Sequence, residues 1–224
     1  MITAASNSRI KRLVQLNQKS KLRRTEDVFL AEGVKMFLEA PREQLQEVYV
    51  SESFLEKCSC REHLEEVGYE VVSDSVFSKI SDTCTPQGVL CVLKQFHYNI
   101  EEMLRDKAPL FLLLENIQDP GNLGTMLRTG EGAGVSGIIM SRDTVDLYNP
   151  KVIRSTMGSI YRVPFYYADD FAAAVCHLFR TNQAELARWQ REYSYLLVDE
   201  FQDINAAQYE ACLLYTSDAA DDRI

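Results

Sequence analysis

Apolar residues recur at helical spacing near the N-terminus and then in short runs along the first half of the chain. Ile10, Leu13, Val14 and Leu16 share one side of a helix predicted over residues 8–17, with basic residues on its other side. Beyond it, short apolar runs alternate with helical stretches, which predicts an α/β domain. The predicted strands are residues 28–31, 47–50, 69–72 and 88–93, and the predicted helices are residues 33–40, 53–58 and 74–80.

A second α/β unit is predicted in the following part of the chain. Residues 110–114 are apolar on both faces, which is typical of an interior parallel strand covered by helices. A turn-rich segment follows, and Asn122 is placed to cap a helix over residues 123–132. In such βαβ arrangements, ligands bind at the carboxyl ends of the strands. Two more strands are predicted at residues 137–140 and 161–165, and two more helices at residues 149–156 and 169–179.

Residues 97–107 are polar, are predicted to form a linker or a connecting helix, and set the expected division between the two units. We predict one domain over residues 1–98 and a second over residues 108–179, both of the α/β class. Residues 180–224 are predicted to form a separate C-terminal segment.

The composition is that of a globular protein and excludes several other classes. The 224 residues are 46% hydrophobic and 25% charged, which argues against disordered, collagen-like and coiled-coil chains. No uncharged apolar run approaches the length of a membrane span, and the first residues are basic where a signal peptide would be apolar. We therefore expect a cytoplasmic protein without a membrane partner, and we expect its six cysteines to stay reduced.

Charge is distributed unevenly along the chain. The formal net charge is −9, yet residues 1–24 contain seven basic residues and no acidic ones. Residues 169–224 contain eleven acidic residues and four basic ones. The basic N-terminus favours an anionic partner such as nucleic acid, although basic residues on the solvated face of a helix would give the same pattern.

Common cofactor and metal motifs are absent from the sequence. The glycines at positions 130, 132 and 134 follow a predicted helix, where glycine acts as a terminator, and neither a dinucleotide fingerprint nor a phosphate loop occurs. Cys58, Cys60 and His63 resemble half of a zinc site, but no second pair lies at a useful spacing, so we predict no metal. The three histidines fall in no recognisable nucleophile frame.

Asn122 and Arg128 are the remaining chemical candidates, and both lie in the helix that follows the first strand of the second unit. An arginine beside a sheet edge can bind a phosphate through two hydrogen bonds. The spacing also allows a purely structural arginine, paired with Glu131 or Glu115. The residues alone leave both possibilities open.

Two long segments resemble one enzyme family. The segments "LENIQDPGNLGTMLRTGEGAG" (residues 114–134) and "NPKVIRSTMGSIYRVPF" (residues 149–165) resemble motifs of the SpoU (TrmH-type) RNA 2′-O-ribose methyltransferases of the SPOUT superfamily. Residues 1–95 are similar to the small RNA-binding domain of that family, through "SNSRIKRLVQL", "FLAEGVKMFLEA" and "DTCTPQGVLCVL".

The resemblance implies a fold, a reaction and a partner. It implies a parallel-sheet, knotted SPOUT-like domain that transfers a methyl group from S-adenosyl-L-methionine to a ribose 2′-hydroxyl of rRNA or tRNA, in a homodimer. Arg128 would be the catalytic arginine, and Asn122 would hold the local site. The cofactor-binding residues stay unassigned, because the family's Gly-x-Glu-Gly and Ser-Leu-Asn segments do not occur here. The predicted RNA-binding residues are Arg9, Lys11, Arg12, Arg23, Arg24, Arg154, Thr156 and Gly158.

The C-terminal segment resembles a different family. "ELARWQREYSYLLVDEFQDINAAQYE" (residues 185–210) is similar to the second ATPase motif of UvrD-type helicases, and the last dozen residues resemble translated adapter sequence. We therefore expect a C-terminally truncated methyltransferase joined to a foreign tail, with its activity in doubt. The alternative is an RNA-binding module without catalysis.

Overall fold

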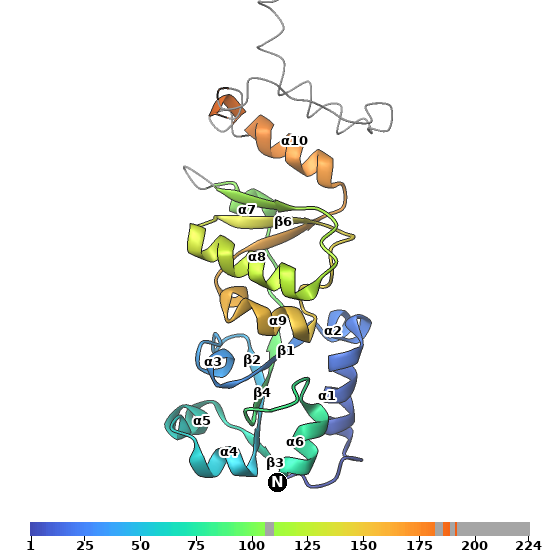
Figure 1. Cartoon of the computed structure of the whole chain (residues 1–224), viewed down its shortest axis with the longest axis vertical. Coiled ribbons are helices and arrows are strands. Elements are labelled where there is room, and N and C mark those ends of the chain that lie inside the picture. The colour runs from blue at the N-terminus through green and yellow to red at the C-terminus, as the bar shows by residue number, and fades with distance from the viewer. Residues whose placement is uncertain (106–109, 182–185, 189–190, 192–224) are drawn as a thin grey trace, which may run out of the picture.

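The computed structural model describes residues 1–105, 110–181, 186–188 and 191. Two α/β units are stacked along the long axis of the molecule, with the N-terminal unit at one end and α10 (Phe171–Thr181) beyond the sheet of the second unit (Figure 1). This arrangement confirms the predicted fold class. Among the described residues, no helix combines the length and the apolar character needed to cross a bilayer.

The N-terminal unit is built around a mixed four-stranded sheet in the order β1-β4-β2-β3. β4 pairs antiparallel with both β1 and β2, whereas β2 and β3 are parallel. The elements are α1 (Ser8–Gln18), α2 (Ser20–Glu26), β1 (Val28–Glu32), α3 (Val34–Leu38), β2 (Leu45–Ser51), α4 (Glu52–Lys57), α5 (Arg61–Val67), β3 (Glu70–Val72), α6 (Asp74–Ile80) and β4 (Val89–Lys94).

The amphipathic N-terminal helix is confirmed. The Asn7 side chain accepts a hydrogen bond from the Arg9 backbone N–H at 2.9 Å and so caps α1. Ile10, Leu13 and Leu16 are at most 1% exposed, as their spacing predicts. The short helices α2 and α5 were not predicted, because their charged sequences carry no apolar period over enough residues.

The second unit contains a parallel sheet in the order β5-β6-β7. The elements are α7 (Ile100–Met103), β5 (Phe111–Leu114), α8 (Pro120–Ala133), β6 (Gly137–Ser141), α9 (Pro150–Thr156), the 3-10 helix η1 (Ser159–Tyr161), β7 (Phe165–Ala168) and α10. The knot implied by the resemblance would involve chain after Thr181, most of which lies outside the described residues.

Two strand predictions in this unit need correction. We expected β5 to be interior, but β6 is the middle strand of the described sheet and most of β5 is only half-buried. The predicted strand at residues 161–165 is wrong, since η1 occupies its start and β7 begins at Phe165. Pro164 has no backbone N–H to donate to a ladder, although its carbonyl accepts a hydrogen bond from Ile138 at 2.9 Å.

The two units share one hydrophobic core. Phe29 of β1 packs on Tyr148, with ring centroids 4.8 Å apart, and a single buried cluster extends across both sheets. The Tyr161 hydroxyl donates a hydrogen bond to the Met36 carbonyl of α3 at 3.0 Å. Because apolar packing and directed hydrogen bonds both cross this boundary, the second unit is held in a fixed position relative to the N-terminal helices.

Candidate functional site

Two loops meet at the carboxyl ends of β5 and β6 and are joined by hydrogen bonds. The Asn116 N–H donates to Ser141 Oγ at 2.8 Å, and the Ile117 N–H donates to Thr144 Oγ1 at 3.3 Å. The Val145 N–H in turn donates to the Ile117 carbonyl at 2.8 Å. These bonds fix the backbone that leads into α8, at the sheet edge where ligands of parallel sheets bind.

The start of α8 differs from the sequence prediction. Asp119 is the N-cap, and its side chain accepts a hydrogen bond from the Asn122 N–H at 2.7 Å. Pro120 takes the first helical position, where its missing N–H costs no hydrogen bond. The prediction that Asn122 caps this helix is therefore wrong, and Asn122 lies exposed in the first turn.

Arg128 lies exposed on α8, and within the described residues it makes no hydrogen bond or ion pair. Glu131, one of the two partners considered for a structural pair, instead accepts hydrogen bonds from Arg162 and from Ser159 Oγ. The hydrogen bonds from Arg162 and Ser159 lower the pKa of the Glu131 carboxyl. As far as the described residues go, the side chain of Arg128 is thus left free for an external partner.

Asn122 and Arg128 are not brought together by the helix. They are separated by six residues, or about 9 Å along the helix axis, and they point in different directions around it. Neither residue lines the cavity between the two units. The structure therefore places on α8 an exposed guanidinium, unpaired in the part of the chain that is described, and a separate exposed amide at the helix start.

Close packing of α8 against α9 sets the position of Arg128. A Cβ atom added to Gly124 would lie 2.8 Å from the Val152 carbonyl oxygen and would collide with Ser155. Leu123 and Leu127 are fully buried on either side of this glycine. The glycine therefore permits the close helix pair on which the orientation of Arg128 depends.

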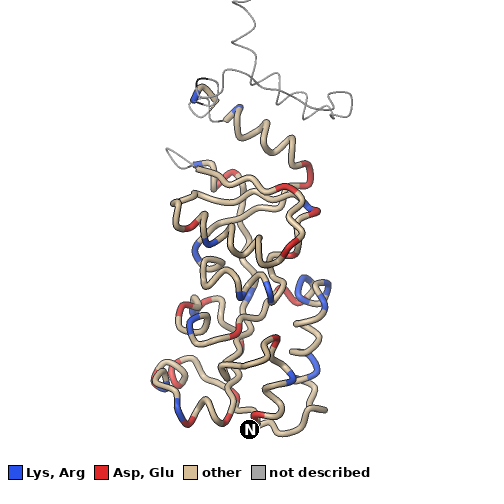
Figure 2. The backbone as a smooth tube through the Cα atoms, viewed as in Figure 1, with Lys and Arg blue, Asp and Glu red and all other residues tan. Residues whose placement is uncertain are grey.

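Figure 2 shows Lys and Arg residues gathered on α1 and α2. Lys11 and Arg24 are exposed, and neither makes an ion pair within the described part of the chain. Arg9 pairs with Glu70 at 3.1 Å, with 61% of its side chain exposed. Arg12 is held more firmly, because Glu26 and Glu47 accept its hydrogen bonds at 2.6 and 2.7 Å.

Arg23 is an internal residue, which corrects its predicted role in RNA binding. Its side chain is only 3% exposed and pairs with Asp146 of the second unit at 2.6 Å. It also donates to the Leu16 carbonyl at 2.6 Å and to the Asn17 carbonyl at 3.2 Å. A guanidinium bound in this way connects the end of α1 to the loop after β6 and is not available to phosphate.

Three further predicted RNA contacts also have structural roles. Arg154 is exposed but pairs with Asp82 of the N-terminal unit at 3.2 Å. Thr156 is fully buried, and its hydroxyl donates to the Ile153 carbonyl at 2.7 Å. Gly158 has a φ of 98° and lies against Glu39, where only a residue without a side chain fits easily.

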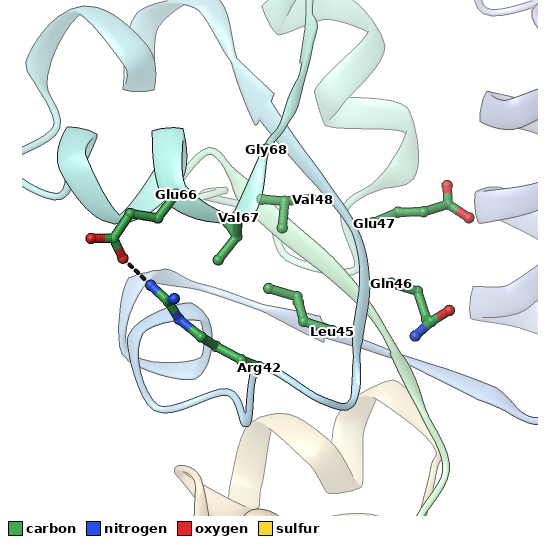
Figure 3. Close-up of a pocket in the computed structure, with 8 residues that line it drawn as sticks. All are labelled: Arg42, Leu45, Gln46, Glu47, Val48, Glu66, Val67 and Gly68. Atoms are coloured by element: carbon green, nitrogen blue, oxygen red, sulfur yellow. Dashed lines mark hydrogen bonds and ion pairs between the residues drawn. The ribbon is translucent and has the colours of Figure 1, made fainter.

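A separate hollow lies within the N-terminal unit. Figure 3 shows Arg42 reaching across to Glu66, with Leu45 and Val67 to one side of this pair. The hollow measures about 190 Å³, and its one arginine is already engaged by Glu66. No residue of the strand-end loops or of α8 contributes to its lining, so it is not part of the candidate site.

Comparison with known families gives two adjoining matches. Residues 7–91 match the MRM3-like substrate binding domain, and residues 109–208 match the SpoU rRNA Methylase family. The gap between them falls at the boundary predicted from the sequence. The second match also enters the segment 180–224 that we predicted to be foreign, most of which lies outside the described residues.

Several proteins with similar sequences or structures are named as rRNA methyltransferases. The chain is 29% identical to the 23S rRNA (guanosine(2553)-2′-O)-methyltransferase RlmP of Bacillus subtilis, over 93% of this chain and 86% of that protein. It is 41% identical to the human mitochondrial rRNA methyltransferase 3 over 38% of this chain, and it spans only 21% of that relative's length. A crystal structure of an rRNA methyltransferase from Sinorhizobium meliloti matches with a TM-score of 0.65 and 25% identity, covering 97% of this chain and 96% of that one.

Fold and site together define a two-domain SPOUT-like α/β protein, in which a basic N-terminal unit is fixed against a parallel sheet. Within this chain, residues 109–208 resemble the SpoU rRNA Methylase family, and residues 7–91 in front of them resemble the MRM3-like substrate binding domain.

Proposed function

We propose that this protein is an S-adenosylmethionine-dependent RNA 2′-O-methyltransferase that acts on ribosomal RNA, with Arg128 as its catalytic arginine. The observation that carries the proposal is the free guanidinium of Arg128 on a helix whose start and packing are both fixed. The names of the relatives support the reaction and the substrate class.

In this reaction the ribose 2′-hydroxyl, a poor nucleophile, attacks a methyl carbon in line with the carbon–sulfur bond. S-adenosylmethionine would supply the methyl group: the ribose 2′-oxygen bonds to the methyl carbon as the bond from that carbon to sulfur breaks, which releases S-adenosylhomocysteine, and the hydroxyl proton passes to water. Arg128 binds the phosphate next to the target ribose and so holds the 2′-oxygen in place. Orientation of this kind accounts for a large part of the rate in such reactions. The donor-binding residues stay unassigned.

The test measures transfer of a labelled methyl group to ribosomal RNA by the full chain. Arg128→Ala should abolish transfer while leaving binding of S-adenosylmethionine nearly unchanged. Thr129→Ala is the matched control, because Thr129 is an exposed neighbour on α8. Equal transfer by the two variants would refute the role given to Arg128.

The same assay decides the alternative of an RNA-binding module without catalysis. That alternative predicts RNA affinity that falls with salt, by about 0.7 log unit per log unit of salt for each phosphate contacted on a single strand, with no methyl transfer. Lys11, Arg24 and Arg9 are the proposed phosphate contacts of the N-terminal unit, since their side chains are exposed.

Further assignments stay predictions of the proposed function. Residues 1–98 would bind RNA, and residues 108–179 would belong to the catalytic domain. Sequencing of the source locus would test whether residues 180–224 are natural. A homodimer is proposed and is tested by light scattering. The expected cytoplasmic location also stays a prediction.

A further inference from the structure

A cavity of about 300 Å³ lies where the two units meet. Its walls come from four separate segments: the end of α2, the linker after β4, the loop after β6, and β7. Small-molecule sites occur preferentially at such domain junctions, and this volume falls at the lower end of their usual range. No local pattern in the sequence indicates this cavity, because its lining residues are spread over more than 100 positions of the chain.

Aromatic rings form much of the wall, and hydrogen bonds hold two of them in place. The Tyr148 hydroxyl accepts from the Phe96 N–H at 2.6 Å and donates to the Phe96 carbonyl at 3.0 Å. The Tyr167 hydroxyl accepts from the Leu147 N–H at 3.0 Å and donates to the Val145 carbonyl at 2.9 Å. Burial raises the pKa of Tyr167 to about 12, so this hydroxyl stays neutral. Since both hydroxyls are engaged, the rings offer stacking surface with little further hydrogen bonding.

One unpaired cation lies in the wall of the same cavity. Arg24 is exposed and, among the described residues, has no ion-pair partner, whereas Arg142 is paired with Asp169 at 2.6 Å. Asp146, the acidic residue in the lining, is neutralised by Arg23. Arg24 lies in the last turn of α2, one of the two helices on which Figure 2 shows basic residues gathered.

We propose that this cavity binds an unpaired nucleotide of the RNA substrate, with its base against the rings of Phe96 and Tyr167 and a phosphate on Arg24. Stacking surfaces combined with backbone-tracking cations are how proteins hold single-stranded nucleic acid. Because the tyrosine hydroxyls are engaged, the cavity selects by shape and stacking and shows little preference among bases. The proposal rests on the proposed function and adds a second contact point away from Arg128.

The first experiment compares two matched variants of the full chain in binding a single-stranded oligouridylate across a range of salt. Arg24→Gln should reduce the slope of log affinity against log salt by about 0.7, the loss of one phosphate contact. Lys57→Gln removes the same charge from α4, away from α1, α2 and the cavity lining, and should leave the slope unchanged. Both side chains are exposed, so both variants should fold.

A second experiment locates the base. Photocrosslinking of an oligouridylate that carries 5-iodouridine should yield adducts on Phe96, Tyr148 or Tyr167. Equal slopes for the two variants, or adducts confined to other segments, would overturn the cavity assignment while binding and methyl transfer by the unaltered chain still support the proposed function. Loss of all RNA binding by the unaltered chain would overturn both.

Discussion

Removing the Asp146 carboxylate should destabilise the protein far more than removing an exposed partner from the basic surface. The Arg23 side chain is 3% exposed and that of Asp146 is 16% exposed, with 2.6 Å between their charged atoms. Asp146→Ala leaves a buried guanidinium without its counter-charge, a change that costs about 3–5 kcal/mol. For a chain of this size, that cost corresponds to a fall in the melting temperature of roughly 6–20 °C.

The assay is urea unfolding followed by circular dichroism, with Glu70→Ala as the control. Glu70 forms a solvent-exposed ion pair with Arg9, and loss of such a pair lowers the free energy of unfolding by less than about 1 kcal/mol. Arg23→Met together with Asp146→Leu should cost less than the two single changes added, because neither charge is then left alone. A cost below about 1 kcal/mol for Asp146→Ala, or strict additivity in the double variant, would refute the assignment of a buried pair.

Three other outcomes are expected. Gly124→Ala should cost about 1–3 kcal/mol in thermal unfolding and reduce methyl transfer, whereas Gly132→Ala, which meets no neighbour, should be neutral or stabilising. Tyr161→Phe should cost about 1 kcal/mol, through the lost hydrogen bond to Met36. The lowered pKa of Glu131 contributes stability above about pH 4.3 that is lost as the pH falls through that pKa, so Glu131→Gln should flatten the acid limb of the stability profile.

Local patterns in the sequence predicted the elements better than they predicted the contacts. The apolar period of residues 8–17 correctly identified α1 and its buried side. The apolar runs located six strands to within a few residues. The misplaced β7 shows the limit of this method, because the β-branched and aromatic residues before Pro164 fit a strand and a buried 3-10 turn equally well.

The use of each arginine could not be predicted, because it depends on residues distant in the sequence. Arg23 and Arg24 are neighbours, yet one is buried against Asp146 and the other is exposed beside the junction cavity. The pattern of charges along the sequence does not distinguish these two arginines. Likewise, the spacing on α8 allowed Arg128 to pair with Glu131, and only the position of Arg162 decides that it does not.

The shared core bears on the choice between an enzyme and a binding module. A module that only binds RNA does not require a second domain at a fixed position. Here, however, Phe29 and Met36 of the N-terminal unit contact Tyr148 and Tyr161 of the second unit. Methyl transfer does need such rigidity, since a displacement of about 1 Å at the reacting atoms can cost a hundredfold in rate. The fixed junction therefore supports the proposed function, in which RNA bound on α1 and α2 would present one ribose to the helix that carries Arg128.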